Sequence, residues 1–246
     1  MKVISSIGII VVLVLIIIVV LCIYYSNNDC YKLNEYFTRH CKHPSILNTH
    51  DKVWTQRFRD NYKWIKDEFL DYSEENYIPE YSDIDSKASL KTDGWKSIFL
   101  KVFGNKTIAS VKFPITMALI NSVECTTAYF SILEPKTKIK PHNGVYKGVL
   151  RYHLGLIVPS GDLFIEIDGK RLYWKEGEDL LFDDMFIHHV ENNTLERRVV
   201  LFMDIKRDFE NIWLNILNTL FLVLGKSNEH VRSLLKNADM AHTSSI

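Results

Sequence analysis

Two histidines in strand-like segments could hold a metal ion. His142 follows a proline at the start of one segment, and His188 lies in the segment FDDMFIHHV. Imidazole nitrogens bind Fe(II), Zn(II) and Cu(II) alike, so the residue types indicate a metal site without choosing the metal. His189 competes with His188, because successive side chains of a strand point to opposite faces and only one of them can face inward.

The run PHNGVYKGVLRYHLGL, residues 141–156, places charge in a segment that otherwise has strand character. With a period of two, the leucines and the tyrosine of LRYHLGL share an apolar face, whereas Arg151 and His153 share the opposite face. Two interpretations remain open. The polar face belongs to an edge strand and lies in water, or it lines a cavity in which the charge of Arg151 has a partner.

A second arginine opens the segment RVVLFMDI. Arg198 shares a face with Asp204 and with apolar side chains between them, so its guanidinium lies at the start of an otherwise apolar side. A planar guanidinium there could bind a carboxylate through two parallel hydrogen bonds. The alternative is a structural salt bridge from Arg198 to Asp204 or Asp183.

The composition limits the classes of protein that could carry these residues. The chain has 246 residues, of which 47% are apolar, and can bury one substantial core. Its 30 basic and 30 acidic side chains give zero formal net charge, and no basic run suggests a nucleic-acid partner. The four cysteines form no CxxC pair, which argues against a structural zinc site. Cys30 and Cys41 could pair in an oxidising compartment, and this alternative stays open.

The N-terminus is predicted to be a transmembrane anchor over residues 1–25. Residues 4–25 are apolar and uncharged, and as a helix they would be roughly 33 Å long, enough to cross a bilayer. We therefore expect a single-pass membrane protein, in the secretory-pathway or endoplasmic-reticulum membrane if the chain is eukaryotic or viral in a eukaryotic host. The flanking charges leave the side of the membrane open. Residues 26–50 are polar and aperiodic, which is typical of a tether.

Helices are expected on both sides of a β-rich region. Residues 51–72 space apolar side chains at helical intervals, which predicts an amphipathic helix. From 127 to 205, short strand-like runs alternate with turn residues, including the hairpin signal Asp168-Gly169, and this favours a sandwich or jelly roll. Residues 207–246 form a helical tail whose apolar stripe either covers the sheet or lies on a membrane surface. The fold is therefore predicted to be mainly β with flanking helices.

Three segments together resemble a known enzyme family. PHNGVYKGVLRYHLGL, WKEGEDLLFDDMFIHHVEN and RRVVLFMDI contain, in order, the patterns H-x-G, L-R-x-H-L-G-L, F-D-D-x-F-x-H and R-x-x-L-x-x-D. These patterns are similar to the aspartyl/asparaginyl β-hydroxylase family of Fe(II)- and 2-oxoglutarate-dependent dioxygenases. The resemblance assigns residues 51–206 to such a dioxygenase domain and implies a double-stranded β-helix, or jelly roll.

The resemblance also implies a metal site. His142 and His188 occupy the positions of the iron ligands, with His188 rather than His189 at the ligand position after FDDMF. Most enzymes of this chemical class add a carboxylate two residues after the first histidine. That position is Gly144 here, and the family is similar in having glycine there, so water is expected to fill the vacant position.

The cosubstrate residues follow from the same resemblance. Arg198 is expected to bind 2-oxoglutarate, with His153 and Ser131 as its helpers, and Arg151 to contact the substrate or the cosubstrate. With Fe(II) as cofactor and O2 as second cosubstrate, the implied reaction yields succinate, CO2 and a hydroxylated product.

The substrate is predicted less directly. The first hypothesis is an Asp or Asn side chain of a protein or peptide. The second is a lipid acyl chain, because the tail DIKRDFENIWLNILNTLFLVLG resembles that of membrane-bound lipid A hydroxylases. A third is a membrane-anchored binding module that keeps the fold without turnover. Succinate formation coupled to a substrate separates the enzyme from the module.

Overall fold

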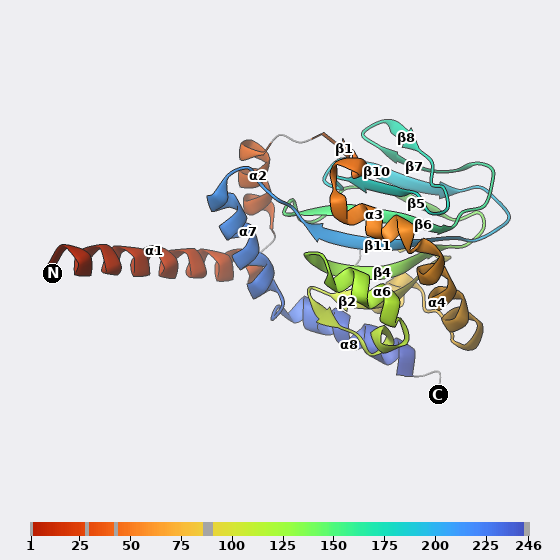
Figure 1. The fold of residues 1–246 in the computed structure, drawn as a ribbon, viewed down its shortest axis with the longest axis horizontal. Coiled ribbons are helices and arrows are strands. Elements are labelled where there is room, and N and C mark those ends of the chain that lie inside the picture. Colours follow the sequence, from red (N-terminus) through yellow and green to blue (C-terminus); the bar gives the residue numbers. More distant parts are fainter. Residues whose placement is uncertain (1, 28–29, 42–43, 86–90, 244–246) are drawn as a thin grey trace.

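The computed structural model describes residues 2–27, 30–41, 44–85 and 91–243. Within them, two antiparallel sheets form the body of the molecule (Figure 1), a seven-stranded sheet of order β1-β9-β6-β11-β4-β2-β3 and a four-stranded sheet of order β5-β10-β7-β8. The strands are β1 (Ile46–Leu47), β2 (Trp95–Val102), β3 (Asn105–Lys106), β4 (Cys125–Leu133), β5 (Lys138–His142), β6 (Val149–Ile157), β7 (Leu163–Ile167), β8 (Lys170–Leu172), β9 (Asp179–Phe182), β10 (His188–Asn192) and β11 (Arg198–Lys206).

The order of the strands is that of a jelly roll. From β4 to β11, β4, β6, β9 and β11 lie in the larger sheet, and β5, β7, β8 and β10 lie in the smaller one. Side chains of both sheets pack together in one cluster, which includes Leu133, Val200, Ile165 and Val190. The mainly β jelly roll expected from the strand pattern is therefore what the structure has.

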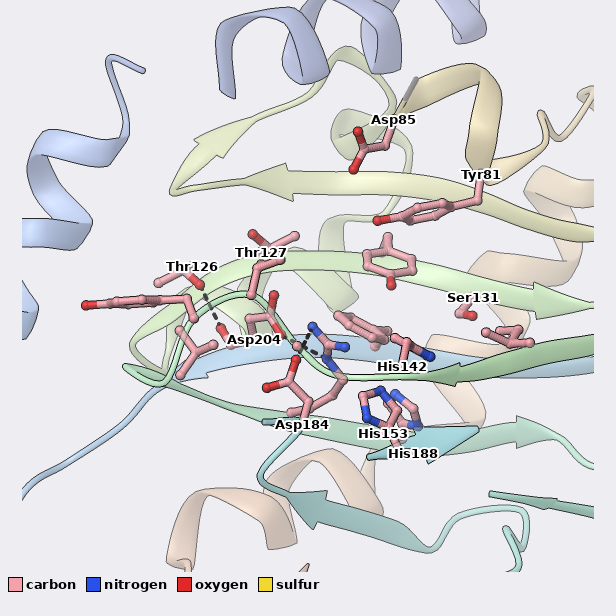
Figure 2. Close-up of a pocket in the computed structure, with 18 of the residues that line it drawn as sticks. Tyr81, Asp85, Thr126, Thr127, Ser131, His142, His153, Asp184, His188 and Asp204 are labelled. Carbon is pink, nitrogen blue, oxygen red and sulfur yellow. Dashed lines mark hydrogen bonds and ion pairs between the residues drawn. The ribbon is translucent and has the colours of Figure 1, made fainter. Parts of the chain in front are cut away.

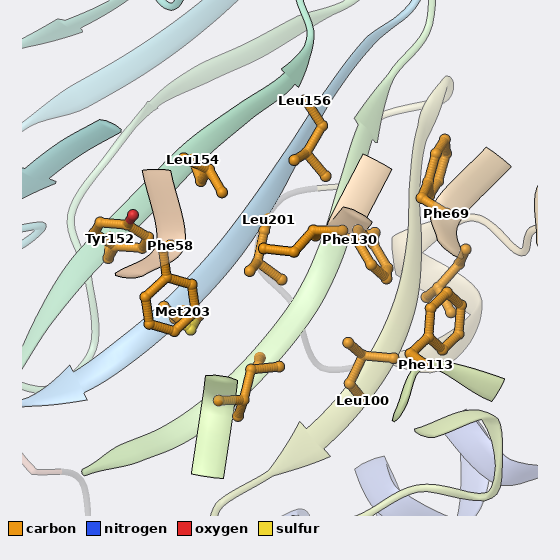
Figure 3. Packing of buried hydrophobic residues seen from close by; sticks show 14 of the residues in the cluster. Phe58, Phe69, Leu100, Phe113, Phe130, Tyr152, Leu154, Leu156, Leu201 and Met203 are labelled. Atoms are coloured by element: carbon orange, nitrogen blue, oxygen red, sulfur yellow. The ribbon is translucent and has the colours of Figure 1, made fainter. Parts of the chain in front are cut away.

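Each strand of the larger sheet divides its side chains between two environments. Leu154, Leu201 and Phe130 are fully buried on one face, where Phe58 and Phe69 of the neighbouring helices pack on them (Figure 3). Burying each such side chain contributes about 1.5 to 3 kcal/mol. The alternate residues of the same strands face the smaller sheet, and they form the candidate site together with His142 of β5 and His188 of β10.

Helices flank this body, and α1 projects away from it (Figure 1). They are α1 (Lys2–Asn27), α2 (Tyr31–His40), α3 (Val53–Asp60), α4 (Tyr62–Glu75), α5 (Tyr81–Ile84), α6 (Pro114–Asn121), α7 (Ile212–Gly225) and α8 (Glu229–Thr243), with short 3-10 turns at η1 (Thr49–Asp51) and η2 (Ile108–Lys112). The amphipathic helix predicted over 51–72 is present but breaks at Asn61, whose φ of −108° and ψ of 11° are not helical. The break separates α3 from α4.

The segment predicted to be a membrane anchor is the helix α1. Among the residues that the structure describes, no helix is both long enough and apolar enough to cross a membrane. The prediction of an N-terminal transmembrane helix is therefore wrong.

The segment predicted as a polar tether is folded where the structure describes it. α2 buries Leu33 and Phe37, and the ring of Phe37 stacks on Phe209 at 4.7 Å between centroids. Leu33 and Phe37 are four residues apart, so a short helix places both on one face. Cys41 ends α2 as a buried free thiol, so its disulfide with Cys30 is not formed. β1 then joins the edge of the larger sheet by pairing with β9.

The C-terminal tail forms two helices against the body. Phe221 of α7 stacks on Tyr146, in the loop before β6, at 4.5 Å between ring centroids. Val231 and Leu234 of α8 pack in one cluster with Phe99 of β2. Part of the apolar stripe of the tail is thus packed on the body, whereas Ile212 and Trp213 of the same stripe are exposed.

Candidate active site

A cavity of about 450 Å³ lies between the two sheets and contains every site residue singled out from the sequence (Figure 2). We divide its wall into two parts. The histidine half consists of Ser131, His142, His153, His188 and Arg198, and the carboxylate half of Tyr81, Thr127, Arg151, Asp184 and Asp204. Arg151 and His153 line this cavity, so the polar face of β6 does not lie in water at a sheet edge.

His142 and His188 meet across two neighbouring strands. They are opposite each other in the pairing of β5 with β10, and their ring centroids are 4.1 Å apart. The Nδ1 atoms lie 2.8 Å and 2.9 Å from the carbonyl oxygens of Lys140 and Phe186. A carbonyl only accepts a hydrogen bond, so each Nδ1 carries the proton and each Nε2 keeps its lone pair for a ligand.

Both histidines are neutral as metal ligands must be. Burial, together with the nearby His142 and Arg151, lowers the pKa of His188 to about 3. Burial also lowers the pKa of His142. Within the part of the chain that the structure describes, no group of three or more His, Cys, Asp or Glu side chains is placed to hold one metal ion. The histidine pair is accordingly the whole of the candidate ligand set among these residues.

His189 points away from the cavity. Its ring is 5.8 Å from that of Phe164, and its Nε2 is 4.0 Å from a carboxylate oxygen of Glu191 on the outer face of the small sheet. The alternation along β10 therefore places His188 inward, as the family motif predicts.

Gly144 lies directly against the carboxyl group of Asp184. A Cβ atom built on Gly144 would lie 2.0 Å from Asp184 Oδ2, and the backbone N–H of Gly144 donates to the Asp184 carbonyl at 2.7 Å. No real Cβ fits at that distance, so the close approach of these two residues requires glycine. The position predicted to be a vacant carboxylate site is thus one where a side chain would collide with another carboxylate.

Arg198 is buried without an acidic partner among the described residues. It is 1% exposed, and its Nη1 donates to the carbonyl oxygen of Ser131 at 3.1 Å and to Ser131 Oγ at 3.4 Å. Its Nε has no hydrogen-bond partner, and its guanidinium lies 4.8 Å from the ring centre of Trp174. Burial lowers the pKa of Arg198 to about 9.

The two salt-bridge alternatives for Arg198 are both taken by other residues. Asp204 pairs with Arg151, whose Nε lies 3.2 Å from Asp204 Oδ1. Asp183 pairs with Lys147 and with Arg207, the latter at 2.8 Å. The interpretation of Arg198 as a structural salt-bridge partner is therefore excluded by the contacts that these aspartates make.

Ser131 and His153 add hydrogen-bonding groups beside Arg198. Trp95 Nε1 donates to Ser131 Oγ at 3.1 Å, so the serine hydroxyl keeps its own proton to donate. Both ring nitrogens of His153 are buried without a hydrogen-bond partner, and burial next to Arg198 and Arg151 lowers its pKa well below the usual value. A neutral imidazole there still offers one N–H donor.

Arg151 is held by two carboxylates. Its Nη2 lies 2.9 Å from Asp184 Oδ2, its Nε lies 3.2 Å from Asp204 Oδ1, and its guanidinium stacks over Phe202 at 4.4 Å. The two aspartates hold the pKa of Arg151 above its ordinary value, although burial opposes this. Burial raises the pKa of Asp204 to about 6, with Arg151 opposing the rise. The charge of Arg151 is already neutralised inside the protein.

Sequence reasoning missed two residues of the site. Asp184 connects the FDD segment to Gly144 and Arg151, and the pair of acids preceding His188 was a signal for it. Trp174 covers the guanidinium of Arg198 and lies 6.1 Å from the ring of His153. It follows the short strand β8, where no local pattern indicated that it would turn inward.

Comparisons with known proteins identify the family of this chain. The family model described as aspartyl/asparaginyl β-hydroxylase matches residues 59–208, well over half of the chain. The chain belongs to the aspartyl/asparaginyl β-hydroxylase family, and the resemblance of its three motif segments is confirmed.

Two relatives show the range of this family. The chain is 39% identical over 171 residues to an ornithine lipid ester-linked acyl 2-hydroxylase of Rhizobium tropici, a match that covers 65% of this chain and 60% of that protein. It is 31% identical over 155 residues to the aspartyl/asparaginyl β-hydroxylase of Mus musculus, covering 59% of this chain and 20% of that protein. The chain therefore matches less than two thirds of the length of either relative.

Among solved structures, a predicted oxalate decarboxylase of Thermotoga maritima aligns with a TM-score of 0.32 and 14% identity, over 50% of this chain and 96% of that one. A cupin domain of Schizosaccharomyces pombe Cnp3 aligns with a TM-score of 0.32 and 10% identity, over 51% of this chain and 81% of that one.

Proposed function

We propose that this chain is an Fe(II)- and 2-oxoglutarate-dependent hydroxylase. The proposal rests on the environment of Arg198. This residue is a buried cation with no acidic partner among the described residues, and it lies in the same cavity as a pair of neutral histidines. An uncompensated buried charge is costly, so its presence indicates a bound anion in the working protein.

The residues fit the groups that the family implies. His142 and His188 would hold Fe(II) through their Nε2 atoms, because their Nδ1 atoms are already bonded to backbone carbonyls. Arg198, Ser131 and His153 would bind a carboxylate of 2-oxoglutarate through the guanidinium, the hydroxyl and one imidazole N–H. Iron, when bound, supplies the activation of O2 that is coupled to oxidative decarboxylation of 2-oxoglutarate.

The protein's own part is to bind, orient and exclude water. Trp174 stacks on the guanidinium of Arg198 and Trp95 donates to Ser131, so the anion-binding groups have fixed positions before a ligand arrives. The overall reaction consumes a substrate C–H bond, 2-oxoglutarate and O2. It yields the C–OH product, succinate and CO2, and two of the four electrons that reduce O2 come from each organic partner.

Two substrate classes follow from the family. One is an Asp or Asn side chain of a protein or peptide, the class named for the mouse relative. The other is a lipid acyl chain, which is favoured by the higher identity to the Rhizobium tropici acyl hydroxylase. A binding module without turnover is the remaining alternative.

The proposal is tested by the conversion of 2-oxoglutarate to succinate by the full chain with Fe(II), against panels of peptides and acyl lipids. Wild-type protein should form succinate, and His188→Ala should abolish this turnover because one ligand of the pair is lost. His189→Ala is the matched control and should stay active, since His189 faces outward. Metal binding without any succinate formation would favour the binding module, and an active His188→Ala with an inactive His189→Ala would overturn the site.

A further inference from the structure

We infer that the carboxylate half of the cavity receives an uncharged acyl chain, and that α7 and α8 limit the length of the chain it accepts. This inference rests on the proposed hydroxylase function and selects one of its two substrate classes.

The charged groups of the carboxylate half disfavour a substrate carboxylate. Arg151 is the arginine of this half, and both sides of its guanidinium are engaged by Asp184 and Asp204. A substrate carboxylate would have to displace one of these internal partners or lie beside them against like charge. A third acidic residue, Asp85, also lines the cavity, with an oxygen 3.8 Å from Nε2 of His230. The wall is therefore unfavourable to the side chain of an aspartate.

The cavity wall is also apolar over part of its surface. Large apolar and aromatic side chains from several elements surround the ionic network. They are Phe103, Tyr146, Val149, Phe202, Leu222 and Leu234. Pockets that bind apolar ligands have such walls with a few fixed polar groups. A hydrocarbon chain that replaces water along this wall gains the burial of each methylene.

Two C-terminal helices, α7 and α8, contribute to the cavity wall. Leu222 belongs to α7 and Leu234 to α8, and both helices lie beyond residues 59–208, which match the family model. This part of the cavity is therefore a feature that the family match does not determine.

α7 and α8 are fixed to the body at this end. The buried Asn218 of α7 donates to the carbonyl oxygens of Gly148 at 2.9 Å and of Arg207 at 3.1 Å, and it accepts from the hydroxyl of Tyr146 at 2.7 Å. Asn237 of α8 donates to the carbonyl oxygen of Ile84 at 3.0 Å. These bonds hold Leu222 and Leu234 in place, so the wall can act as a stop for a chain.

The inference is tested by equilibrium binding of two uncharged acyl probes and one aspartate probe to the full chain without added metal or 2-oxoglutarate. Octanoyl glycinamide and dodecanoyl glycinamide are compared with N-acetyl-aspartate amide by isothermal titration. Dodecanoyl glycinamide should bind most tightly, octanoyl glycinamide less tightly, and the aspartate probe not measurably. Tighter binding of the aspartate probe would overturn the inference.

Two neighbouring residues of α7 give a matched pair of variants. Leu222 lines the cavity and is 7% exposed, whereas Val223 does not line it and is 53% exposed. Leu222→Trp should weaken dodecanoyl glycinamide roughly tenfold and octanoyl glycinamide less, because the longer chain loses burial of its last methylenes. Val223→Trp should leave both affinities unchanged. Equal effects of the two variants would overturn the role of α7.

A second variant, with a smaller side chain at residue 222, tests the inference if Leu222→Trp does not fold. Leu222→Ala lengthens the cavity, so it should favour dodecanoyl over octanoyl glycinamide more strongly than wild type does. An unchanged preference would contradict the inference.

These outcomes separate the inference from the proposed function. Acyl binding without succinate formation would remove the hydroxylase function while leaving the chain site. Succinate formation coupled only to aspartate peptides would keep the hydroxylase function and remove the acyl site.

Discussion

Two buried arginines in one cavity have opposite electrostatic environments. Arg151 of β6 has Asp184 and Asp204 within 3.2 Å, and these carboxylates raise its pKa. Within the described part of the chain, Arg198 of β11 donates only to the carbonyl oxygen and Oγ of Ser131, and burial lowers its pKa to about 9. Both lie on neighbouring strands and face the same cavity.

We propose that this difference separates a structural charge, that of Arg151, from a ligand-binding charge, that of Arg198. Arg151 is satisfied in the folded protein and joins β6, β11 and the segment before β10 through its partners. Arg198 is not satisfied until an anion arrives, and folding accepts an electrostatic penalty for it. A stability penalty retained at a buried position is typical of a binding site.

The largest expected effect is on stability, and it has opposite signs at the two arginines. Arg151→Met strands two buried carboxylates and should lower the free energy of unfolding by about 3 to 5 kcal/mol. Arg198→Met removes an uncompensated charge and should leave the free energy of unfolding of the ligand-free protein unchanged, or raise it by up to about 4 kcal/mol. Urea denaturation at neutral pH measures both.

Arg171→Met is the control for these variants. Arg171 forms an exposed ion pair with Glu166 at 3.0 Å on the outer face of the small sheet, so its replacement should have no measurable effect on unfolding. Equal destabilisation by Arg151→Met and Arg198→Met would mean that the two arginines are both structural, and the comparison would fail.

The next effect concerns the shape of the cation. Arg198→Lys keeps a positive charge but loses the planar fork that two parallel hydrogen bonds require. The affinity for 2-oxoglutarate should fall by about tenfold, less than for a neutral replacement. Titration of 2-oxoglutarate into metal-loaded protein measures this. An affinity equal to that of wild type would show that the charge alone is recognised and that bidentate binding is absent.

The smallest effect is a dependence on pH. The pKa of Arg198 in the empty cavity is lowered to about 9, so the cation that would bind the carboxylate is progressively lost as the pH rises through that value. The affinity for 2-oxoglutarate should therefore fall by about half at pH 9 and by about tenfold at pH 10 relative to neutral pH. Metal occupancy measured in the same samples is the control. A constant affinity over this range at constant occupancy would contradict the unpaired environment of Arg198.

The fold could be predicted from sequence because its strands alternate regularly. The Asp168-Gly169 signal is a tight turn between β7 and β8, with positive φ at both residues, 53° and 71°. The same alternation indicated which side chains of β6, β10 and β11 share a face, and the family resemblance then indicated which of these faces lines the cavity. These are local properties of single strands, so local patterns suffice to predict them.

Contacts between distant segments could not be predicted in the same way. The approach of Asp184 to Gly144 depends on the pairing of β5 with β10, and the sequence alone indicated only that Gly144 had no side chain. The partner of Arg198 was ambiguous because Asp204 and Asp183 were both candidates in sequence, and Asp184 as a partner of Arg151 was missed. α2 was missed because its two buried side chains are few among polar neighbours, and the apolar N-terminus was wrongly predicted to cross a membrane. The functions of the individual site residues remain predictions.

The central claim is that Arg198 binds a carboxylate of 2-oxoglutarate. Isothermal titration of 2-oxoglutarate into the full chain loaded with Mn(II) in place of Fe(II) tests it most directly, with wild type and Arg198→Met compared at equal metal occupancy. We predict that wild type binds 2-oxoglutarate and that Arg198→Met binds it at least about a hundredfold more weakly, because one partner of a buried charge pair is removed. Equal affinity of the two proteins would contradict the claim.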